Sequence, residues 1–358
     1  MLRKESHQTK RMKIISVVGA RPQFIKLGPL SREIRKDHEE VIIHTGQHYD
    51  EVMSDLFFKQ LEIPKPDINL EAGSGKHGAQ TAKMLEGIEE QIERIKPDMV
   101  LSFGDTNSTL AACLAASKME VPSLHIEAGL RSFNRSMPEE INRIVADHTA
   151  DLLFAPTQAA VKHLEREGLG ARTVLTGDIM ADSVAFVQQK MGSNPFEGEE
   201  YLLLTLHRPY NVDDPENLRK LFKHVADLEK KIVFPAHPRT KKVIEEHEIE
   251  IPGCMELIAP QGYIEFQGLL KFSEKVITDS GGLQKEAYIA GKPCITLRPE
   301  TEWVETVEAG WNLLLDVRDP DVAEKIMNFN PSNIRPNLYG KNVAQRMVSE
   351  IEAFYDRM

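Results

Sequence analysis

Short apolar segments alternate with longer amphipathic segments along almost the whole chain, and this alternation limits the possible folds more than any other feature. A short run rich in Val, Ile and Leu is typical of a buried strand, whereas apolar residues at every third or fourth position are typical of a helix. Strands that alternate with helices form a parallel sheet covered by crossover helices. The pattern therefore predicts an α/β protein.

The predicted strands fall into two series. The first is expected at 13–18, 41–45, 99–103, 123–127, 152–155 and 173–176, and the second at 201–205, 231–234, 255–258, 275–278, 294–297 and 313–316. With 358 residues, of which 41% are hydrophobic, the chain is long enough for two domains that each bury a core. We therefore expect two Rossmann-like domains facing a central cleft.

A short polar stretch separates the two series. Residues 191–200 read MGSNPFEGEE and combine Gly, Pro, Asn and acidic residues, as interdomain linkers do. The first domain is therefore expected at 12–190, and the second, which would bind the nucleotide, at 200–340. A final helical segment, 341–358, follows a loop with Pro and Gly and is expected to cross back to the first domain.

Composition and charge exclude several kinds of partner. No apolar run reaches the ~20 residues that cross a bilayer, and the N-terminal MLRKESHQTKRM lacks the apolar stretch of a signal peptide. A cytoplasmic protein without a membrane partner is therefore expected. The net charge of -11 argues against a broad basic face for nucleic acid.

The three cysteines, Cys113, Cys254 and Cys294, are far apart in the sequence. This spacing favours core thiols over a disulfide or a zinc site.

Two common phosphate-binding motifs are missing from the predicted strand ends. Neither half carries GxGxxG after its first strand or the GxxxxGK[ST] loop of P-loop proteins. Dinucleotide-dependent hydride transfer and ATP hydrolysis therefore lose their main support, and neither a cofactor nor a metal is expected. Open parallel sheets bind ligands at the carboxyl ends of their strands. The polar residues at those ends are therefore the candidates for a site.

Basic residues follow the first strand. In the segment GARPQFIK, Arg21 and Lys26 flank the start of a predicted helix. The amides and the macrodipole at a helix N-terminus favour an anion. The segment therefore indicates an anion site, although an ordinary solvated turn has the same composition.

Carboxylates follow the next strands of the first half. Asp105 comes directly after the strand 99–103, where it could also cap a helix. Glu127 emerges at the end of the following strand, and Glu139 opens a helix four residues before Arg143. That last spacing also fits a surface ion pair worth ~0.3–0.5 kcal/mol. Carboxylates that converge in one site suit the removal and return of a proton.

Histidines beside arginines end two strands of the second half. His207 and Arg208 follow the strand 201–205, and His237 follows the next strand in the segment AHPR. Two such pairs suit a pyrophosphate, because arginine and protonated histidine both donate to phosphate oxygens. Structural roles in the core or at the surface remain open for these histidines.

The segment ITDSGGLQKEA is the most specific motif. Gly281 and Gly282 would let a diphosphate approach the amides at a helix start. Glu286, one turn further on, would accept hydrogen bonds from a ribose. Gln261 and Phe266 precede the motif and offer an amide and an aromatic face to a base.

In order and spacing, these motifs resemble the non-hydrolysing UDP-N-acetylglucosamine 2-epimerases, a family with a glycosyltransferase-B-like fold. The markers are GARPQFIK, TGQHYD, GDTNST, IEAGLR, PEEINR, LHRP, AHP, TDSGGLQKEA and RPETEW, and they span nearly the whole chain. The resemblance implies inversion at carbon 2 of the sugar, through loss and re-addition of UDP, without a redox cofactor. It also implies a homodimer.

Residue roles follow from the same resemblance. The acid/base candidates that it implies are Asp105, Glu127, Glu139 and His207. The substrate contacts that it implies are Arg21, Lys26, Arg143, Arg208, His237, Gln261, Phe266, Ser280, Gly281, Gly282, Glu286 and Arg298. Within this set, the Ser-Gly-Gly turn would hold phosphate oxygens, Glu286 the ribose, and Gln261 and Phe266 the uracil.

Two segments depart from the family pattern. The segment usually written TERPE reads TEWVE at 301–305, so that Trp303 replaces a basic residue. Close relatives that epimerise 2,3-diacetamido uronic acid sugars look similar there, which leaves such a sugar as an alternative substrate. The QHR pattern reads Gln47-His48-Tyr49. In bacterial members this region helps to bind a second UDP-sugar as an activator, and Gln47 and His48 are candidates for that role.

Two further functions remain open at this point. A UDP-sugar-dependent glycosyltransferase would share the fold and the donor contacts, but it needs an acceptor and usually one base. A non-catalytic UDP-sugar sensor would bind without turnover. The three carboxylates of the first half weigh against both.

Overall fold

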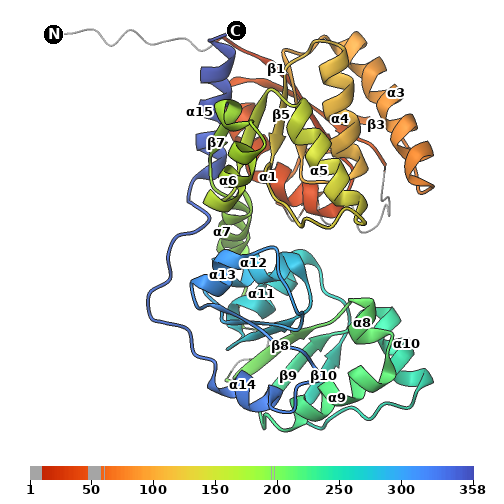
Figure 1. Cartoon of the computed structure of the whole chain (residues 1–358), viewed down its shortest axis with the longest axis vertical. Helices are drawn as coiled ribbons and strands as arrows, with labels where there is room; N and C mark the ends of the chain where they lie inside the picture. The colour runs from red at the N-terminus through yellow and green to blue at the C-terminus, as the bar shows by residue number, and fades with distance from the viewer. Residues whose placement is uncertain (1–9, 47–57, 60, 195, 197) are drawn as a thin grey trace, which may run out of the picture. The chain divides into compact units, whose positions relative to one another are not determined.

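The computed structural model describes residues 10–46, 58–59, 61–194, 196 and 198–358 (Figure 1). The chain divides into two compact units. The first unit extends to Ser183 and includes Tyr339–Met358, and the second is Val184–Leu338. The division falls inside helix α7 (Met180–Lys190), upstream of the linker that the sequence suggested at 191–200.

The first unit is built on a seven-stranded sheet with the order β3-β2-β1-β4-β5-β6-β7. Every strand pairing in it is parallel. Its strands are β1 (Lys13–Val18), β2 (Glu39–His44), β3 (Ile68–Asn69), β4 (Met99–Phe103), β5 (Ser123–Ile126), β6 (Leu152–Ala155) and β7 (Thr173–Leu175). The strand order reverses between β1 and β4, and ligands of such sheets bind at this switch point.

Helices connect these strands and cover the sheet. They are α1 (Arg21–Asp37), α3 (His77–Ile95), α4 (Asn107–Lys118), α5 (Pro138–Thr149), α6 (Gln158–Arg166), the short 3-10 helix η1 (Gly170–Arg172), and α7. Helix α4 carries Ala111, Ala112, Ala115 and Ala116 in the core. These small side chains let α4 approach both α3 and the sheet closely.

The last helix, α15 (Val343–Tyr355), belongs to the first unit. It packs against α1 (Figure 1). At its start, the backbone N–H of Ala344 donates to Asp182 Oδ2 at 2.8 Å, and at its end, the Tyr355 hydroxyl donates to Asp98 Oδ1 at 3.0 Å. The C-terminal segment is thus anchored to the first unit at both ends of its helix.

The second unit has a six-stranded sheet with the order β10-β9-β8-β11-β12-β13, again parallel throughout. Its strands are β8 (Tyr201–Thr205), β9 (Lys231–Pro235), β10 (Met255–Ile258), β11 (Val276–Thr278), β12 (Cys294–Thr296) and β13 (Asn312–Leu314). The order reverses between β8 and β11. Both units therefore have the strand order of a Rossmann fold.

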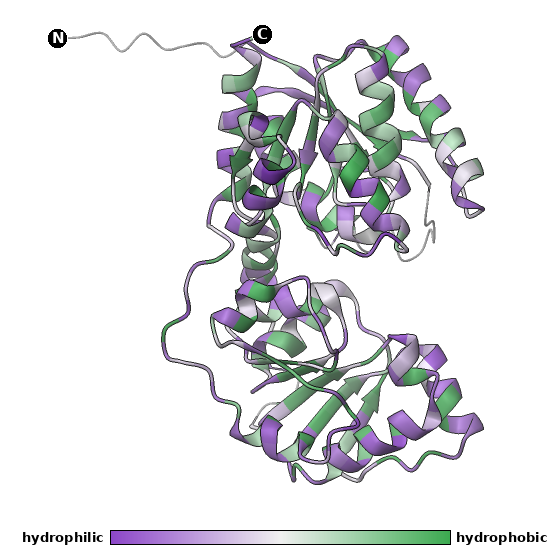
Figure 2. Cartoon of the chain, in the orientation of Figure 1, coloured by the Kyte–Doolittle hydropathy of each residue, from purple (hydrophilic) through white to green (hydrophobic). Residues whose placement is uncertain are grey.

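The helices of the second unit are α8 (Pro209–Val212), α9 (Pro215–Ala226), α10 (Pro238–Glu246), α11 (Tyr263–Phe272), α12 (Gly281–Ala290), α13 (Val304–Glu308) and α14 (Val322–Asn328). Figure 2 shows the strands of both sheets as largely hydrophobic and the helices as mixed. Strands buried on both faces require apolar residues throughout, which is why they read as continuous apolar runs in the sequence.

Two cysteines of the described chain are fully enclosed. Cys113 and Cys294 are buried and Cys254 is partly exposed, and all three are free thiols. Burial raises the pKa of Cys113 and of Cys294 to about 12. The expectation of core or near-core thiols is confirmed.

Among the described helices, none combines the length and apolar character that crossing a bilayer requires.

The buried His44, at the end of β2, gives the first unit a pH-dependent stability. Burial lowers its pKa to about 4, whereas the unfolded value is about 6.5. Between these values the unfolded chain takes up a proton that the folded chain does not. We therefore expect the free energy of unfolding to fall by about 3 kcal/mol as pH decreases from 6.5 to 4. Urea unfolding of wild type and His44→Gln across this range isolates the effect, and identical pH slopes would contradict it.

Candidate active site

Three neighbouring strands of the first unit end at one edge of the sheet. These are β1, β4 and β5, and the turns after them carry Gly19, Asp105 and Glu127. The buried Gln23 joins two of the turns, because its Oε1 accepts from the Gly19 N–H at 2.7 Å and its Nε2 donates to the carbonyl of Phe103 at 2.7 Å. The edge therefore holds candidate carboxylates on a backbone that is fixed by internal hydrogen bonds.

Lys26 and Glu127 form a largely buried ion pair at this edge. Lys26 Nζ contacts Glu127 Oε2, and the two side chains are only 8% and 12% exposed. Gly104 lies beside the pair, since a Cβ added to it would be 3.2 Å from Lys26 Nζ. Glu127 has a φ of 72°, a conformation that costs a non-glycine residue about 1 kcal/mol or more and persists where the surroundings impose it. The fold thus holds the Glu127 carboxylate in place against a backbone preference.

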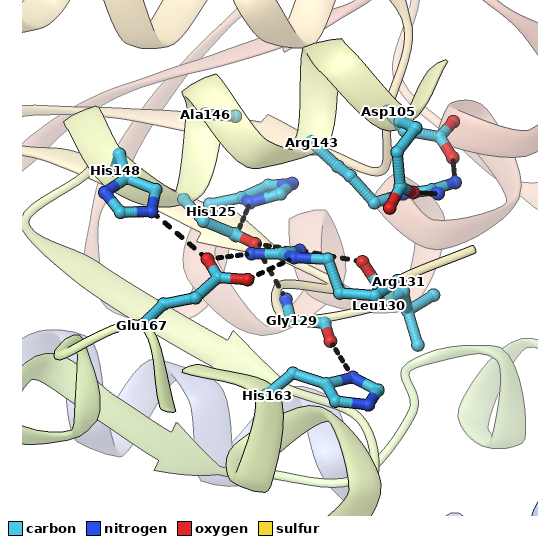
Figure 3. A network of polar contacts seen from close by, with 12 residues as sticks. Asp105, His125, Gly129, Leu130, Arg131, Arg143, Ala146, His148, His163 and Glu167 are labelled. Atoms are coloured by element: carbon cyan, nitrogen blue, oxygen red, sulfur yellow. Dashed lines mark hydrogen bonds and ion pairs between the residues drawn. The ribbon is translucent and has the colours of Figure 1, made fainter. Parts of the chain in front are cut away.

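Asp105 forms the second ion pair of this edge. Its Oδ2 contacts Arg143 Nη2, which comes from α5 (Figure 3). Asn142 Nδ2 also donates to the backbone carbonyl of Asp105 at 3.0 Å. Burial by itself lowers the pKa of Arg143, but Asp105 and Glu140 outweigh it and raise that pKa. Helix α5 therefore positions both the backbone and the carboxylate of Asp105.

Spacing along the helix predicts the wrong ion-pair partner for Arg143. The spacing suggested Glu139, but no ion pair between Glu139 and Arg143 is found among the described residues, and Arg143 instead contacts Glu140. Glu140 is 1% exposed and accepts from the N–H of Ser132 and of Phe133, each at 2.9 Å. The first turn of α5 directs Glu140 into this loop and leaves Glu139 exposed.

The two adjacent glutamates should respond differently to loss of charge. Burial opposes ionisation of Glu140, but hydrogen bonds from Ser132 outweigh it and hold its pKa below the usual value. We expect Glu140→Gln to lower the free energy of unfolding by about 2 kcal/mol. Glu139→Gln, the exposed neighbour, should change it by less than about 0.5 kcal/mol. Urea unfolding of both variants measures this, and equal effects would contradict the assignment.

The second unit has a comparable edge, at the ends of β8, β11 and β12. His207 and Arg208 follow β8, Asp279 and Ser280 follow β11, and Arg298 follows β12. The first two strands are also joined by their last residues, whose hydroxyl groups lie 2.6 Å apart. Histidine, arginine and serine side chains therefore meet at one sheet edge, as the motifs indicated.

Asp279 is the residue of this edge that the sequence analysis did not single out. It is fully buried, and its carboxylate accepts from the backbone N–H of His207 and of Arg208, both at 3.0 Å. It also lies 3.0 Å from His207 Nδ1. Burial opposes its ionisation, but the hydrogen bonds from His207 and Asn211 outweigh it and hold its pKa low. An ionised Asp279 fixes the proton on Nδ1 and leaves Nε2 as the reactive nitrogen.

The cationic side chains of this edge differ in their contacts. Arg298 Nη1 lies 2.9 Å from Glu302 Oε2. Arg208 Nε is buried and, like Arg298 Nη1, has no hydrogen-bond partner among the described residues. Ser280 caps α12 by accepting from the Leu283 N–H at 3.4 Å. Arg208 and the start of α12 are therefore the groups of this edge best suited to an anion.

The remaining predicted contacts of the second unit lie at the start of α10, in α12, in α11 and in the loop before α11. His237 is exposed and caps α10, where its Nδ1 accepts from the Arg239 N–H at 3.2 Å. Glu286 of α12 accepts from Gln267 Nε2. Gln261 donates to the carbonyl of Ala259 at 2.7 Å, and Phe266 packs partly against the core.

Comparison with known proteins identifies the family. A family model described as UDP-N-acetylglucosamine 2-epimerase matches residues 32–352. The chain belongs to the UDP-N-acetylglucosamine 2-epimerase family. Like the family, it is an epimerase with a glycosyltransferase-B-like fold. The resemblance inferred from the motifs is confirmed.

Known relatives of this epimerase carry more than one name. A UDP-N-acetylglucosamine 2-epimerase homolog of Methanococcus maripaludis is 48% identical over 90% of this chain and 94% of its own length. A UDP-2,3-diacetamido-2,3-dideoxy-D-glucuronate 2-epimerase of Pseudomonas aeruginosa is 45% identical over 95% of this chain and 99% of its own. The UDP-GlcNAc 2-epimerase of Methanocaldococcus jannaschii, solved with UDP-GlcNAc and UDP, has a TM-score of 0.81, is 39% identical, and covers 96% of this chain and 100% of its own.

Trp303, which departs from the family pattern, contacts a lysine side chain in this epimerase. Trp303 is only 5% exposed, and the ammonium group of Lys285 lies 4.3 Å from the centre of a ring of its indole. This geometry is that of a cation–π contact. The segment 301–305 therefore places an aromatic ring against a buried lysine of α12.

The structure does not describe the side chains of three residues that were predicted to belong to a binding site. Gln47 and His48, the candidates for an activator site, lie outside the described residues. Arg21 begins α1, so that its backbone is at the expected helix start, but its side chain is not among those described.

Proposed function

We propose that this epimerase inverts carbon 2 of UDP-N-acetylglucosamine and gives UDP-N-acetylmannosamine. The observation that carries the proposal is the edge of the first unit, where two carboxylates follow adjacent strands and each contacts its own cation. Asp105 contacts Arg143, and Glu127 contacts Lys26. The solved relative from Methanocaldococcus jannaschii, which binds UDP-GlcNAc and UDP, supports the choice of nucleotide sugar.

The proposed chemistry is an elimination followed by an addition. A base removes the proton on carbon 2, a double bond forms between carbons 1 and 2, and UDP leaves with the electron pair of its bond to carbon 1. UDP then adds back to carbon 1 while an acid delivers a proton to the opposite face of carbon 2. One group must accept a proton and another must donate one, which is why carboxylates in different surroundings are required.

We assign the acid/base work to four candidate residues. Asp105, Glu127 and Glu139 are the candidates of the first unit, and His207 is the candidate of the second. Asp105 and Glu127 each contact a cationic side chain that is largely buried, Arg143 and Lys26 respectively. Glu139 is exposed, so that it is open to exchange a proton with a ligand or with water.

We assign the UDP contacts to the second unit. Arg208 and the start of α12 would bind the diphosphate, because phosphate oxygens match a guanidinium group and exposed helix amides. A negative leaving group is stabilised by such donors as its charge develops. The remaining contacts of the second unit in this assignment are His237, Gln261, Phe266, Glu286 and Arg298. Arg21, Lys26 and Arg143 of the first unit remain substrate contacts in this proposal.

One observation favours a second substrate. The chain is 45% identical to a 2-epimerase of UDP-2,3-diacetamido-2,3-dideoxy-D-glucuronate, and Trp303 stands where the family pattern has a basic residue. A UDP-sugar with a 2,3-diacetamido uronic acid is therefore the alternative within the same reaction class. A homodimer in the cytoplasm, and activation by a second UDP-sugar through Gln47 and His48, complete the proposal.

Proton NMR in deuterated water tests the proposal. Purified protein is incubated with UDP-N-acetylglucosamine, and the spectrum is followed over hours with and without added activator sugar. We expect the manno isomer to appear with deuterium at carbon 2. Release of free UDP and free sugar would indicate hydrolysis and contradict the proposal. Turnover of the diacetamido uronic acid substrate alone would transfer the assignment to that sugar.

A further inference from the structure

A fully buried histidine lies directly behind the carboxylates of the first unit. His125 is in β5 and is 0% exposed. Its Nδ1 is 2.6 Å from Asp147 Oδ1, and its Nε2 is 2.6 Å from the backbone carbonyl oxygen of Gly104. Each ring nitrogen therefore faces an oxygen at a short hydrogen-bonding distance.

Both of these oxygens accept hydrogen bonds. A backbone carbonyl has no proton to donate. Asp147 Oδ2 accepts from Arg131 Nη1 at 2.7 Å and from the Gly129 N–H at 3.0 Å. Contact with a guanidinium group favours the ionised carboxylate, so that Asp147 Oδ1 faces His125 as an acceptor as well. Both ring nitrogens of His125 must then donate. The ring consequently carries two protons and a positive charge.

Charged partners compensate this buried cation. Asp147 Oδ2 also accepts from Arg131 Nη1 at 2.7 Å. Arg131 in turn binds Glu167 through two hydrogen bonds, from Nε at 2.8 Å and from Nη2 at 2.7 Å. The charges alternate along this row of four side chains, of which Figure 3 labels His125, Arg131 and Glu167. Such pairing is what a buried charge requires, because an isolated one would cost several kcal/mol.

The row of charges holds the backbone of two turns. His125 donates to the carbonyl of Gly104, the residue before Asp105. Asp147 accepts from the N–H of Gly129 at 3.0 Å, and Arg131 donates to the carbonyl of Leu130 at 2.7 Å. Gly129 lies in the turn that begins with Glu127, and Leu130 directly follows that turn. The contacts therefore end on the backbone of the turns that present the two candidate catalytic carboxylates.

We propose that His125 is a positioning residue of this epimerase, which in its doubly protonated form clamps the Gly104 carbonyl and, through Asp147, the Gly129 turn. It does not touch the substrate in this assignment. The inference rests on the proposed function, because it assumes that Asp105 and Glu127 exchange protons with the sugar. Removal of the clamp would shift both carboxylates relative to each other, and a displacement of about 1 Å in such groups costs roughly 100-fold in rate.

The protonation state is tested without turnover. The wild-type protein is labelled with ¹⁵N in its histidine rings, and the His125 signals are assigned by their loss in His125→Phe. We expect both ring nitrogens of His125 to carry a bonded proton at neutral pH in the absence of substrate. A ring with a single proton would overturn the proposal. Because no substrate is present, this result is independent of whether the proposed reaction is correct.

Kinetics test the positioning role. We expect His125→Phe, which keeps a ring but loses both hydrogen bonds, to lower kcat about 100-fold with KM changed less than threefold. His125→Gln, whose amide can take the place of Nε2–H, should recover part of this loss. The matched control is His148→Gln, since His148 is exposed and its side chain contacts the far end of the row, at Glu167, 3.1 Å away. It should retain wild-type kcat. A folded His125→Phe with kcat within twofold of wild type would overturn the proposal.

A second readout separates positioning from loss of folded protein. Misplaced carboxylates should uncouple elimination from re-addition, so the ratio of released UDP to epimerised sugar should rise in His125→Phe. Partial unfolding would lower the rate and leave this ratio unchanged, and an unchanged ratio would overturn the proposal. If His125→Phe does not fold, Asp147→Asn removes the partner charge and must show the same rise. If the wild type epimerises no UDP-sugar, the proposed function fails, and the labelling experiment alone decides whether the clamp exists.

Discussion

Asp105→Asn is expected to lower kcat by about 1,000-fold while the Kd for UDP stays within tenfold of wild type. Asparagine has the shape of aspartate and can still accept a hydrogen bond from Arg143, but it cannot take up or release the proton. General acid–base groups contribute about 100- to 10,000-fold to a rate. UDP binding is assigned to the second unit and should change little. The deuterium NMR assay gives kcat, and calorimetry with UDP gives the Kd.

Asp37→Asn is the matched control for this prediction. Asp37 is an exposed carboxylate at the end of α1, in the same unit, and the same chemical change there should leave kcat unaltered. Near-normal turnover by Asp105→Asn would remove Asp105 from the mechanism. A large loss of UDP affinity would show that this carboxylate supports binding instead of proton transfer.

Asp279→Asn should lower kcat by about 100-fold or more and also weaken UDP binding by about tenfold. The ionised carboxylate fixes the proton on His207 Nδ1, and an amide allows the other tautomer, a change known to cost an enzyme up to about 10,000-fold. The same carboxylate holds the backbone N–H groups of His207 and Arg208. Loss of that acceptor should loosen the segment that carries Arg208. Steady-state kinetics and calorimetry separate the two effects.

The control for Asp279 is Asp213→Asn. Asp213 is 39% exposed and pairs with Arg239 at the surface of the same unit, so that its loss should change neither kcat nor the Kd. A folded Asp279→Asn protein with wild-type turnover would contradict an orienting role for Asp279. A loss of affinity without a loss of kcat would limit that role to the backbone of Arg208.

The apolar runs predicted the sheets well because buried parallel strands need apolar residues at every position. The strand at 99–103 has the predicted bounds, and so does the strand at 201–205. β3 (Ile68–Asn69) was missed because it is only two residues long. It pairs with β2 through backbone hydrogen bonds, which leave no trace in the pattern of side chains.

The strand ends also predicted where the polar residues meet. Asp105 and Glu127 follow adjacent strands, as expected, since the carboxyl ends of parallel strands lie at one edge. The choice between Glu139 and Glu140 could not be made in the same way. It depends on how the start of α5 faces the loop around Ser132, and this is a tertiary contact that spacing along one helix does not contain.

Buried polar partners were the main omission of the sequence analysis. Asp279 lies within a motif that was recognised, but its partner His207 is 72 residues away in the chain. His125 carried a signal of its own, because it interrupts the apolar run of a strand predicted to be buried on both faces. A polar residue at such a position needs a partner on each side. The identity of those partners, Asp147 and the Gly104 carbonyl, follows only from the folded chain.

The left-handed backbone at Glu127 sets a limit on how this position can evolve. Glycine adopts that conformation without an energetic penalty, whereas for glutamate it lowers the stability of the folded state. If Glu127 exchanges a proton with the sugar, as proposed, the carboxylate is kept despite this loss of stability because turnover requires it. A lineage that inherited this fold but abandoned its chemistry should drift to glycine or asparagine here. Under the proposed role of Glu127, the residue at this position would distinguish proteins that keep the chemistry from descendants that only bind the ligand.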